Sequence, residues 1–154
     1  MRVFRLRIHS DQYQYLAPMQ VADWPKLRTN GYPRSAGWTP PAVGIAHPER
    51  PAGDFFNYYG DSLITGPGAT TALSRFFATA GELLRLPCAM DGQTYGLLNV
   101  LECVDCLDHA RTQIAPDQAS EGHQHITTYA FHGGRLPLRS PLFKLPETCE
   151  VETL

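Results

Sequence analysis

The chain has 154 residues, a length typical of one domain, and we expect residues 1–154 to fold as a single domain with a core that needs neither metal nor disulfide. Its net charge is −2 and its 13 Lys and Arg residues are scattered along the chain, which argues against binding nucleic acid through the phosphates. Its apolar runs are shorter than the roughly 20 residues that span a bilayer, and the N-terminus lacks the apolar core of a secretory signal. We therefore expect no membrane partner and a cytoplasmic protein with reduced cysteines.

The first predicted element covers residues 3–8, where apolar residues alternate with Arg. Phe4, Leu6 and Ile8 would lie on one face of a strand, and Arg5 and Arg7 on the other. This period of two predicts a half-buried antiparallel strand.

Residues 11–60 hold seven of the 13 prolines and both Trp residues. Because proline removes a backbone donor and blocks helix interiors, we expect loops and short edge strands here, with residues 42–46 as the one clear strand. The many aromatic rings argue against disorder. Tyr and Trp are common interface anchors, so four residues are candidates for partner binding: Trp24, Trp38, Tyr58 and Tyr59. The alternative is that these rings cover the sheet as part of the core.

A strand is predicted to end at residues 62–65, and Pro67 then opens a helix at a position where its missing N–H has no cost. Gly81 is the predicted helix end. One face of this principal amphipathic helix would carry Ala69, Leu73, Phe76, Phe77 and Ala80.

Two strands follow, over residues 83–90 and 93–104, and Asp91-Gly92 between them is a hairpin signal. Both faces of the second strand are apolar, so we expect it to be central. Weaker strands are predicted at residues 126–131 and 142–145, and the short acidic tail is expected to be a solvated end (Glu147, Glu150, Glu152). The fold class is therefore α+β: a mainly antiparallel sheet with one principal amphipathic helix and a long loop region rich in Pro and aromatic residues.

Cysteine and histidine residues near the end of the central strand suggest one possible metal site. Cys103-x-x-Cys106 could bind zinc with His109, or cycle as a disulfide. Zinc usually takes four ligands and no second pair follows, so we favour Cys103 as a small core residue. His123-x-His125 is a further two-ligand pattern, interpreted as surface histidines.

Glu102, Asp105 and Asp108 are spaced by three residues. In a helical turn over residues 105–109 these carboxylates would share a face, and could hold Mg²⁺ or act as an acid/base pair. Asp at such a junction more often caps backbone N–H groups, which is the interpretation we favour. We therefore expect no catalytic residues, no cofactor and no metal. The alternative is a metal-binding domain or metal-dependent enzyme that uses Cys103/Cys106/His109 or Glu102/Asp105/Asp108.

The order of short motifs along the chain resembles immunity family eleven of bacterial polymorphic toxin systems. The resemblance covers about residues 42–145, and its sharpest parts are the Y-x-L-L-N-V strand and the V-D-x-L-D that follows it. The matching segments are Asp54-Phe55, Leu63-Ile64-Thr65, the amphipathic helix, Leu86-Pro87, Tyr95-Gly96-Leu97-Leu98-Asn99-Val100, Val104-Asp105-Cys106-Leu107-Asp108 and Leu142-Phe143-Lys144-Leu145.

The resemblance implies an α+β fold and a cytoplasmic, non-enzymatic protein that neutralises a cognate protein toxin encoded by an adjacent gene. It implies structural roles for six motif residues: Asp54, Phe55, Tyr95, Asn99, Asp105 and Asp108. The chain departs from the family in two ways. Thr112 stands where the family often has Ser, and the chain ends at Leu154 where relatives run on through another helix and strand.

Overall fold

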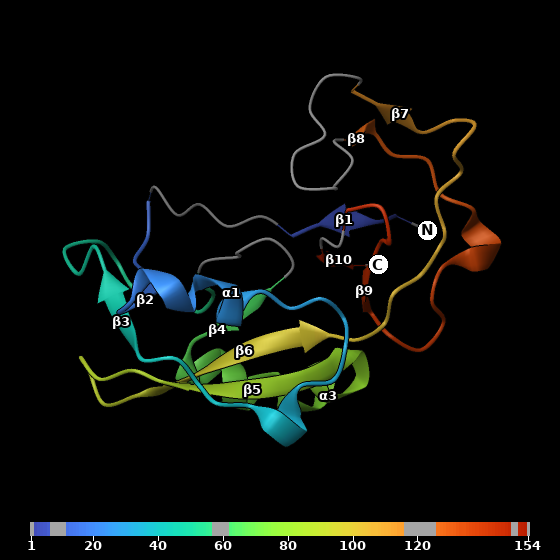
Figure 1. The fold of residues 1–154 in the computed structure, drawn as a ribbon. Helices are drawn as coiled ribbons and strands as arrows, with labels where there is room; N and C mark the ends of the chain where they lie inside the picture. The colour runs from blue at the N-terminus through green and yellow to red at the C-terminus, as the bar shows by residue number, and fades with distance from the viewer. Residues whose placement is uncertain (1, 7–11, 57–61, 116–125, 149–150, 154) are drawn as a thin grey trace.

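The computed structural model describes residues 2–6, 12–56, 62–115, 126–148 and 151–153 (Figure 1). Its strands pair antiparallel in four small sheets, and together with a few short helices they give an α+β fold, as predicted. The strands are β1 (Phe4–Arg5), β2 (Tyr15–Pro18), β3 (Val43–Ala46), β4 (Leu63–Thr65), β5 (Gly81–Pro87), β6 (Thr94–Val100), β7 (Gln113–Ile114), β8 (Ile126–Thr128), β9 (Leu142–Lys144) and β10 (Val151–Thr153).

The helices are short. They are α1 (Trp24–Leu27), α2 (Pro67–Ala72) and α3 (Ser74–Ala80), with 3-10 turns η1 (Val21–Asp23), η2 (Ser35–Gly37) and η3 (Gly133–Arg135). Within the described ranges, none of them has the length and apolar character needed to cross a bilayer. The strand β2 and the helix α1 lie in the proline-rich region and were not predicted. Pro25 fits α1 because it stands in the first turn, where a helix needs no N–H.

The central sheet has the strand order β4-β6-β5, so the predicted central strand is confirmed. Leu98 of β6 stands opposite Leu63 of β4 on one side and Leu83 of β5 on the other. Every residue from Tyr95 to Val100 is buried. The predicted hairpin is also confirmed, because Gly92 has a positive φ of 69° in the turn that joins β5 to β6.

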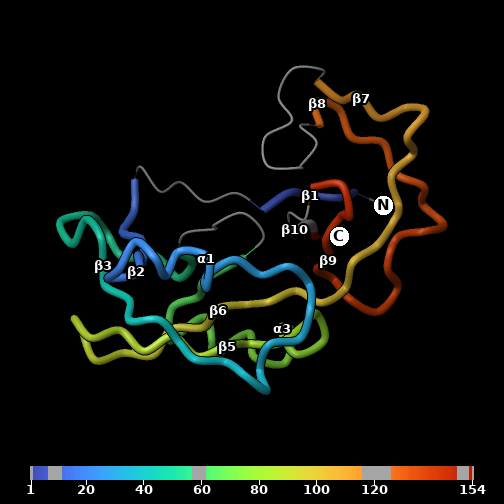
Figure 2. The backbone as a smooth tube through the Cα atoms, viewed as in Figure 1, coloured from blue at the N-terminus to red at the C-terminus, as the bar shows by residue number. Residues whose placement is uncertain are grey.

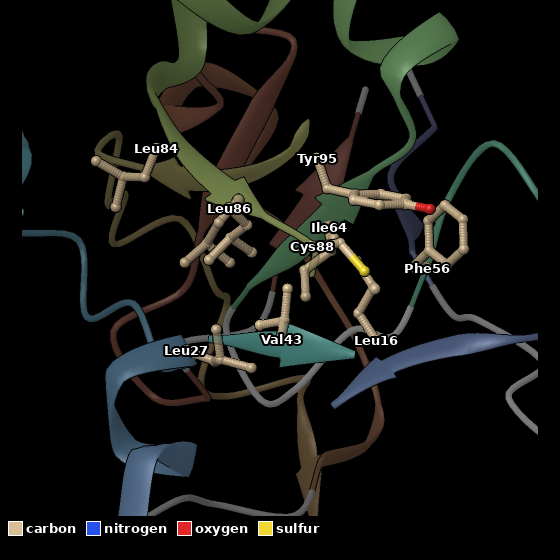
Figure 3. Packing of buried hydrophobic residues seen from close by; sticks show 10 residues of the cluster. Leu16, Leu27, Val43, Phe56, Ile64, Leu84, Leu86, Cys88 and Tyr95 are labelled. Atoms are coloured by element: carbon tan, nitrogen blue, oxygen red, sulfur yellow. The ribbon is translucent and has the colours of Figure 1, made fainter. Parts of the chain in front are cut away.

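One face of the central sheet packs against β2, β3 and α1 (Figure 3). The rings of Phe56 and Tyr95 meet edge to face, with centroids 5.0 Å apart. The buried residues of this cluster are Leu16, Leu27, Val43, Phe56, Ile64, Leu84, Leu86, Cys88, Tyr95 and Leu97.

The opposite face of the sheet is covered by α2 and α3, with Phe77 and Ala80 packed on Leu98 and Val100. The predicted single helix is divided at Leu73, whose φ and ψ are −106° and 10°. Side-chain hydroxyls of Thr71 and Ser74 donate to backbone carbonyls of α2, at 3.0 and 3.1 Å. Such bonds compete with the helix ladder and favour a bend or break at this position.

The predicted apolar face of this helix is wrong at Phe76. Its side chain is 39% exposed, whereas the neighbouring Phe77 is buried. The rotation of α3 after the break at Leu73 turns Phe77 rather than Phe76 toward the sheet.

The strands β1, β9 and β10 lie near the two chain termini (Figure 2) and form a sheet of order β1-β10-β9, and a third cluster of buried residues includes Phe143 of β9. Its residues are Cys106, Leu107, Ile126, Leu136, Phe143 and Leu145. The prediction of a solvated acidic end is wrong for Glu147, whose side chain is 11% exposed, and the C-terminal strand β10 is the middle strand of that sheet. Glu150 lies outside the described residues. Of the predicted N-terminal strand, residues 7–8 lie outside the described residues; within residues 3–6 the strand is β1, and Phe4 on its expected apolar face is 54% exposed.

Candidate partner-binding site

The segment after α1 runs alongside β5, which is an edge strand of the central sheet (Figure 2). Two polar residues of the sheet hold it there. The amide of Asn99, on β6, donates to the Tyr32 carbonyl and to Glu82 Oε1, both at 2.8 Å. The Glu82 carboxylate in turn accepts the backbone N–H groups of Arg34 and Ser35. This network fixes the chain just before Trp38.

The network also sets the ionisation of Glu82. Partial burial on its own raises the pKa of this carboxyl, but hydrogen bonds from Asn99 and from Arg34 and Ser35 outweigh the burial. The pKa of Glu82 is therefore lowered from its usual value, and the group is charged at neutral pH.

The Trp38 ring is held by one contact at its edge and one on its face. Its indole N–H donates to the Arg85 carbonyl of β5 at 2.9 Å, and the guanidinium carbon of Arg34 lies 5.0 Å from the ring centroid. The side chain is half-buried and packs against the first core cluster. A tryptophan restrained in this way presents apolar surface with little conformational entropy left to lose on binding.

A cleft of about 460 Å³ opens beside Trp38 along β5. Its walls combine apolar rings and aliphatic side chains with a few polar groups, and the Arg85 side chain is exposed. The lining residues are Ser35, Trp38, Pro40, Leu83, Leu84, Arg85, Pro87 and Thr94. A mixed surface of this kind, centred on Trp with Arg beside it, has the composition of binding hot spots.

Among the described residues, the predicted anchor Trp24 does not line this cleft. Trp24 is half-buried and packs against the first core cluster, so it follows the alternative interpretation of these rings as core. Tyr58 and Tyr59 lie outside the described residues. Of the four candidates, Trp38 is the one that the structure places at a cleft.

The motif residues of the central sheet have distinct surroundings. Asn99 is buried and anchors the Trp38 segment, and the buried Tyr95 donates its hydroxyl to Asp91 at 2.7 Å. Desolvation and this bond to Asp91 both raise the pKa of Tyr95. The Asp54 carbonyl accepts the Gly66 N–H at 2.7 Å, and Phe55 forms a bridge with Thr65.

Two residues that build the site were missed from sequence: Glu82 and Arg34. A carboxylate at the start of a strand gives no local signal of a bond to a segment almost fifty residues earlier, where |i−j| is 48. The one signal in the sequence is the position of Asn99 on a strand with two buried faces. A buried amide needs hydrogen-bond partners, so this position predicts polar groups nearby.

The residues of the alternative metal sets do not come together. Cys103 is exposed and Cys106 is fully buried. Among the described residues, neither sulfur is close enough to His109 and a third ligand atom for the three to hold one ion. The interpretation of Cys103 as a core residue is therefore wrong: β6 ends at Val100, before the strand could bury it.

The carboxylates of Glu102, Asp105 and Asp108 do not converge either, since residues 105–108 form no helical turn. The segment is instead hydrogen-bonded to a later part of the same chain, since the Asp108 N–H donates to the Ala130 carbonyl at 2.8 Å. The capping interpretation fails for Asp105, because the described partners of its carboxylate are the side chains of His109 and Arg135.

Comparisons with known proteins add no relative. No family model matches the chain, and no curated protein matches it. The likeness to the immunity family thus stays a resemblance between motifs.

Proposed function

We propose that this chain is a cytoplasmic binding protein that neutralises a bacterial protein toxin by forming a stoichiometric complex with it. The observation that carries the proposal is the restrained Trp38 beside the cleft along β5. Trp and Arg are the residues that most often dominate protein–protein binding energy, and here Trp38, Arg34 and Arg85 stand together.

Preorganisation supports the same function. The bonds from Asn99 and Glu82 order the segment that carries Trp38 before any partner arrives. Ordering an interface loop on binding costs free energy, so a loop ordered in advance leaves more of the contact energy for affinity. An inhibitor that must capture a toxin at low concentration benefits directly from this.

The motif resemblance supplies the class of partner. The segments that carry it include β4, β6 and β9, which build the central sheet and the C-terminal sheet. In the immunity family this resemblance implies a toxin encoded by the neighbouring gene. The proposed reaction is binding alone, with no chemical step assigned to any residue.

Co-expression tests the proposal. The product of the adjacent gene is expressed in a bacterial host with and without this chain, and growth is measured together with co-purification of the two proteins. We expect growth arrest that this chain relieves, and a complex of fixed stoichiometry. A toxic neighbour that this chain neither binds nor silences would refute the proposal.

A further inference from the structure

Three potential metal ligands converge in a combination that neither candidate metal set from the sequence included. His109 Nε2 lies 3.2 Å from Glu147 Oε1 and 3.8 Å from Asp105 Oδ1. All three ligand atoms lie within 4.8 Å of one another, and among the described residues no other such group of three is found. The cluster joins the segment at residues 105–109, which follows the central sheet, to the segment that follows β9.

The backbone on both sides of this cluster is fixed by hydrogen bonds. The Val104 N–H donates to the Lys144 carbonyl at 2.9 Å, and the Lys144 N–H donates to the Glu102 carbonyl at 2.8 Å. These bonds align the residues just before Asp105 with those just before Glu147. Main-chain hydrogen bonds therefore bring the two ligand-bearing segments together, and this arrangement does not require attraction between the ligand side chains.

Buried leucines anchor the same two segments. Leu107, between Asp105 and His109, is 1% exposed, and Leu145, two residues before Glu147, is fully buried. Both belong to the third core cluster. Ligands mounted on anchored backbone lose little freedom when an ion binds, as a preorganised metal site requires.

An orphaned oxygen points independently to a missing ligand. The Glu147 side chain is 11% exposed, and its Oε2 is buried without a hydrogen-bond partner. An unsatisfied carboxylate oxygen away from water is costly, and native structures rarely leave one without a reason. The ion pair with His109 engages Oε1 and leaves Oε2 unexplained.

The spacing suits a small divalent transition-metal ion. Zinc lies about 2.0–2.2 Å from nitrogen and carboxylate ligands, so tetrahedral ligands stand about 3.3 Å apart. The pair His109–Glu147 already has that separation, at 3.2 Å. Asp105 is exposed, and its Oδ1 would have to come about half an ångström closer to His109 Nε2 to reach the same separation from that nitrogen.

We propose that Asp105, His109 and Glu147 form a site for a divalent transition-metal ion of the zinc class. One imidazole nitrogen and carboxylate oxygens bind the ion, and water fills the open position. Bound through both carboxylate oxygens, Glu147 also gives its unpartnered Oε2 a partner in the ion. The ion would link the segment at residues 105–109 to the segment after β9, so its role is stabilisation. This proposal departs from our expectation from sequence of a chain without metal.

Arg135 does not block the site. Its Nη1 lies 3.9 Å from Asp105 Oδ2, whereas His109 faces Oδ1. One oxygen of Asp105 remains available to an ion while the other keeps its contact with the guanidinium. Arg135 also offsets part of the negative charge of the two carboxylates, which sets the net charge of the cluster and Arg135 at −1 with neutral His109.

Titration of the metal-free full chain with Zn²⁺ in a calorimeter tests the site. We expect one equivalent bound, a rise in the thermal midpoint with zinc, and at least a tenfold loss of affinity in His109→Ala and in Glu147→Gln. Circular dichroism without zinc checks that both variants are folded. No binding up to 1 mM Zn²⁺, or wild-type affinity in His109→Ala, would overturn the proposal.

The pair His123 and His125 provides a matched control, since histidines spaced by two can bind zinc on their own. The double variant His123→Ala/His125→Ala is expected to keep one equivalent with affinity within twofold of wild type. If zinc binding disappears in this variant and survives in His109→Ala, the site is elsewhere. The result is independent of toxin binding, because neither measurement uses the other's partner.

Discussion

Glu82 connects the central sheet to the surface that we assign to partner binding. Its carboxylate accepts hydrogen bonds from the side-chain amide of Asn99 within the sheet and from the backbone N–H groups of Arg34 and Ser35, in the segment after α1. Neutralising this carboxylate weakens its hydrogen bonds to Asn99 and to the segment of Arg34 and Ser35 at the same time. Hydrogen bonds to a charged group contribute more than neutral ones, so this single residue has a large share in placing Trp38.

Glu82→Gln should lower the free energy of unfolding by about 1–2 kcal/mol at pH 7. Because the pKa of Glu82 is lower in the folded chain than its ordinary 4.5, its stabilising contribution is complete above that value and is lost as the pH falls through the folded pKa. Urea unfolding at pH 7 and at pH 3 measures both effects. The difference between wild type and variant should shrink at pH 3; an equal difference at both values would contradict this role.

The junction between α3 and β5 depends on Gly81. A Cβ atom there would overlap the carbonyl oxygen of Asn99, a main-chain atom of the neighbouring strand. The φ of Gly81 is 172°, so its backbone is ordinary extended chain and the requirement comes from space alone. The sequence pattern predicted a helix end at this glycine, and the structure adds that β5 pairs with β6 from this residue onward.

Gly81→Ala should therefore destabilise the protein by about 1–3 kcal/mol, since the main chain of β6 must shift to admit the methyl group. Thermal unfolding measures the loss. Gly134→Ala is the matched control, because a Cβ there meets nothing within 4 Å. If the two variants unfold at the same temperature, the close packing of α3, β5 and β6 at Gly81 is not a constraint on the fold.

Elements with a complete local signal were predictable. The hairpin at Asp91-Gly92 has its turn residues adjacent, and the Asp91 carboxylate accepts the Gln93 N–H at 3.0 Å. Desolvation of this carboxyl is outweighed by that bond and by the Tyr95 hydroxyl, which lowers the pKa of Asp91. The central strand was likewise visible from its two apolar faces.

Elements that depend on distant partners were not predictable. The strand β10 exists because it lies between β1 and β9, which bracket almost the whole chain. The acidic residue Glu147 looked like part of a solvated end, yet it is mostly buried beside His109. Residues 105–108 form no helix. Their main-chain groups are hydrogen-bonded instead to residues 130–132: the Asp108 N–H donates to the Ala130 carbonyl, and the His132 N–H donates to the Cys106 carbonyl. Pairing across such separations leaves no period in the local sequence.

Across the whole molecule, the central sheet is covered on both faces, so its surface features collect at the edge strand β5. The Trp38 cleft lies at this edge, and the proposed metal site lies at the C-terminal side, next to the third cluster. The two sites use different elements. A partner at the cleft and an ion at the cluster of Asp105, His109 and Glu147 should therefore bind independently.

Trp38→Ala should weaken the complex with the toxin by at least about 2 kcal/mol, roughly thirtyfold in Kd, because it removes a restrained anchor from the centre of the surface. Leu138→Ala is the control, since Leu138 is 95% exposed and does not line the cleft. Circular dichroism confirms that both variants are folded.

Calorimetric titration of the purified toxin with wild type, Trp38→Ala and Leu138→Ala decides whether the cleft along β5 is the binding surface. Weakened binding in Trp38→Ala alone is the expected result. Equal affinity for all three proteins would show that the toxin binds elsewhere.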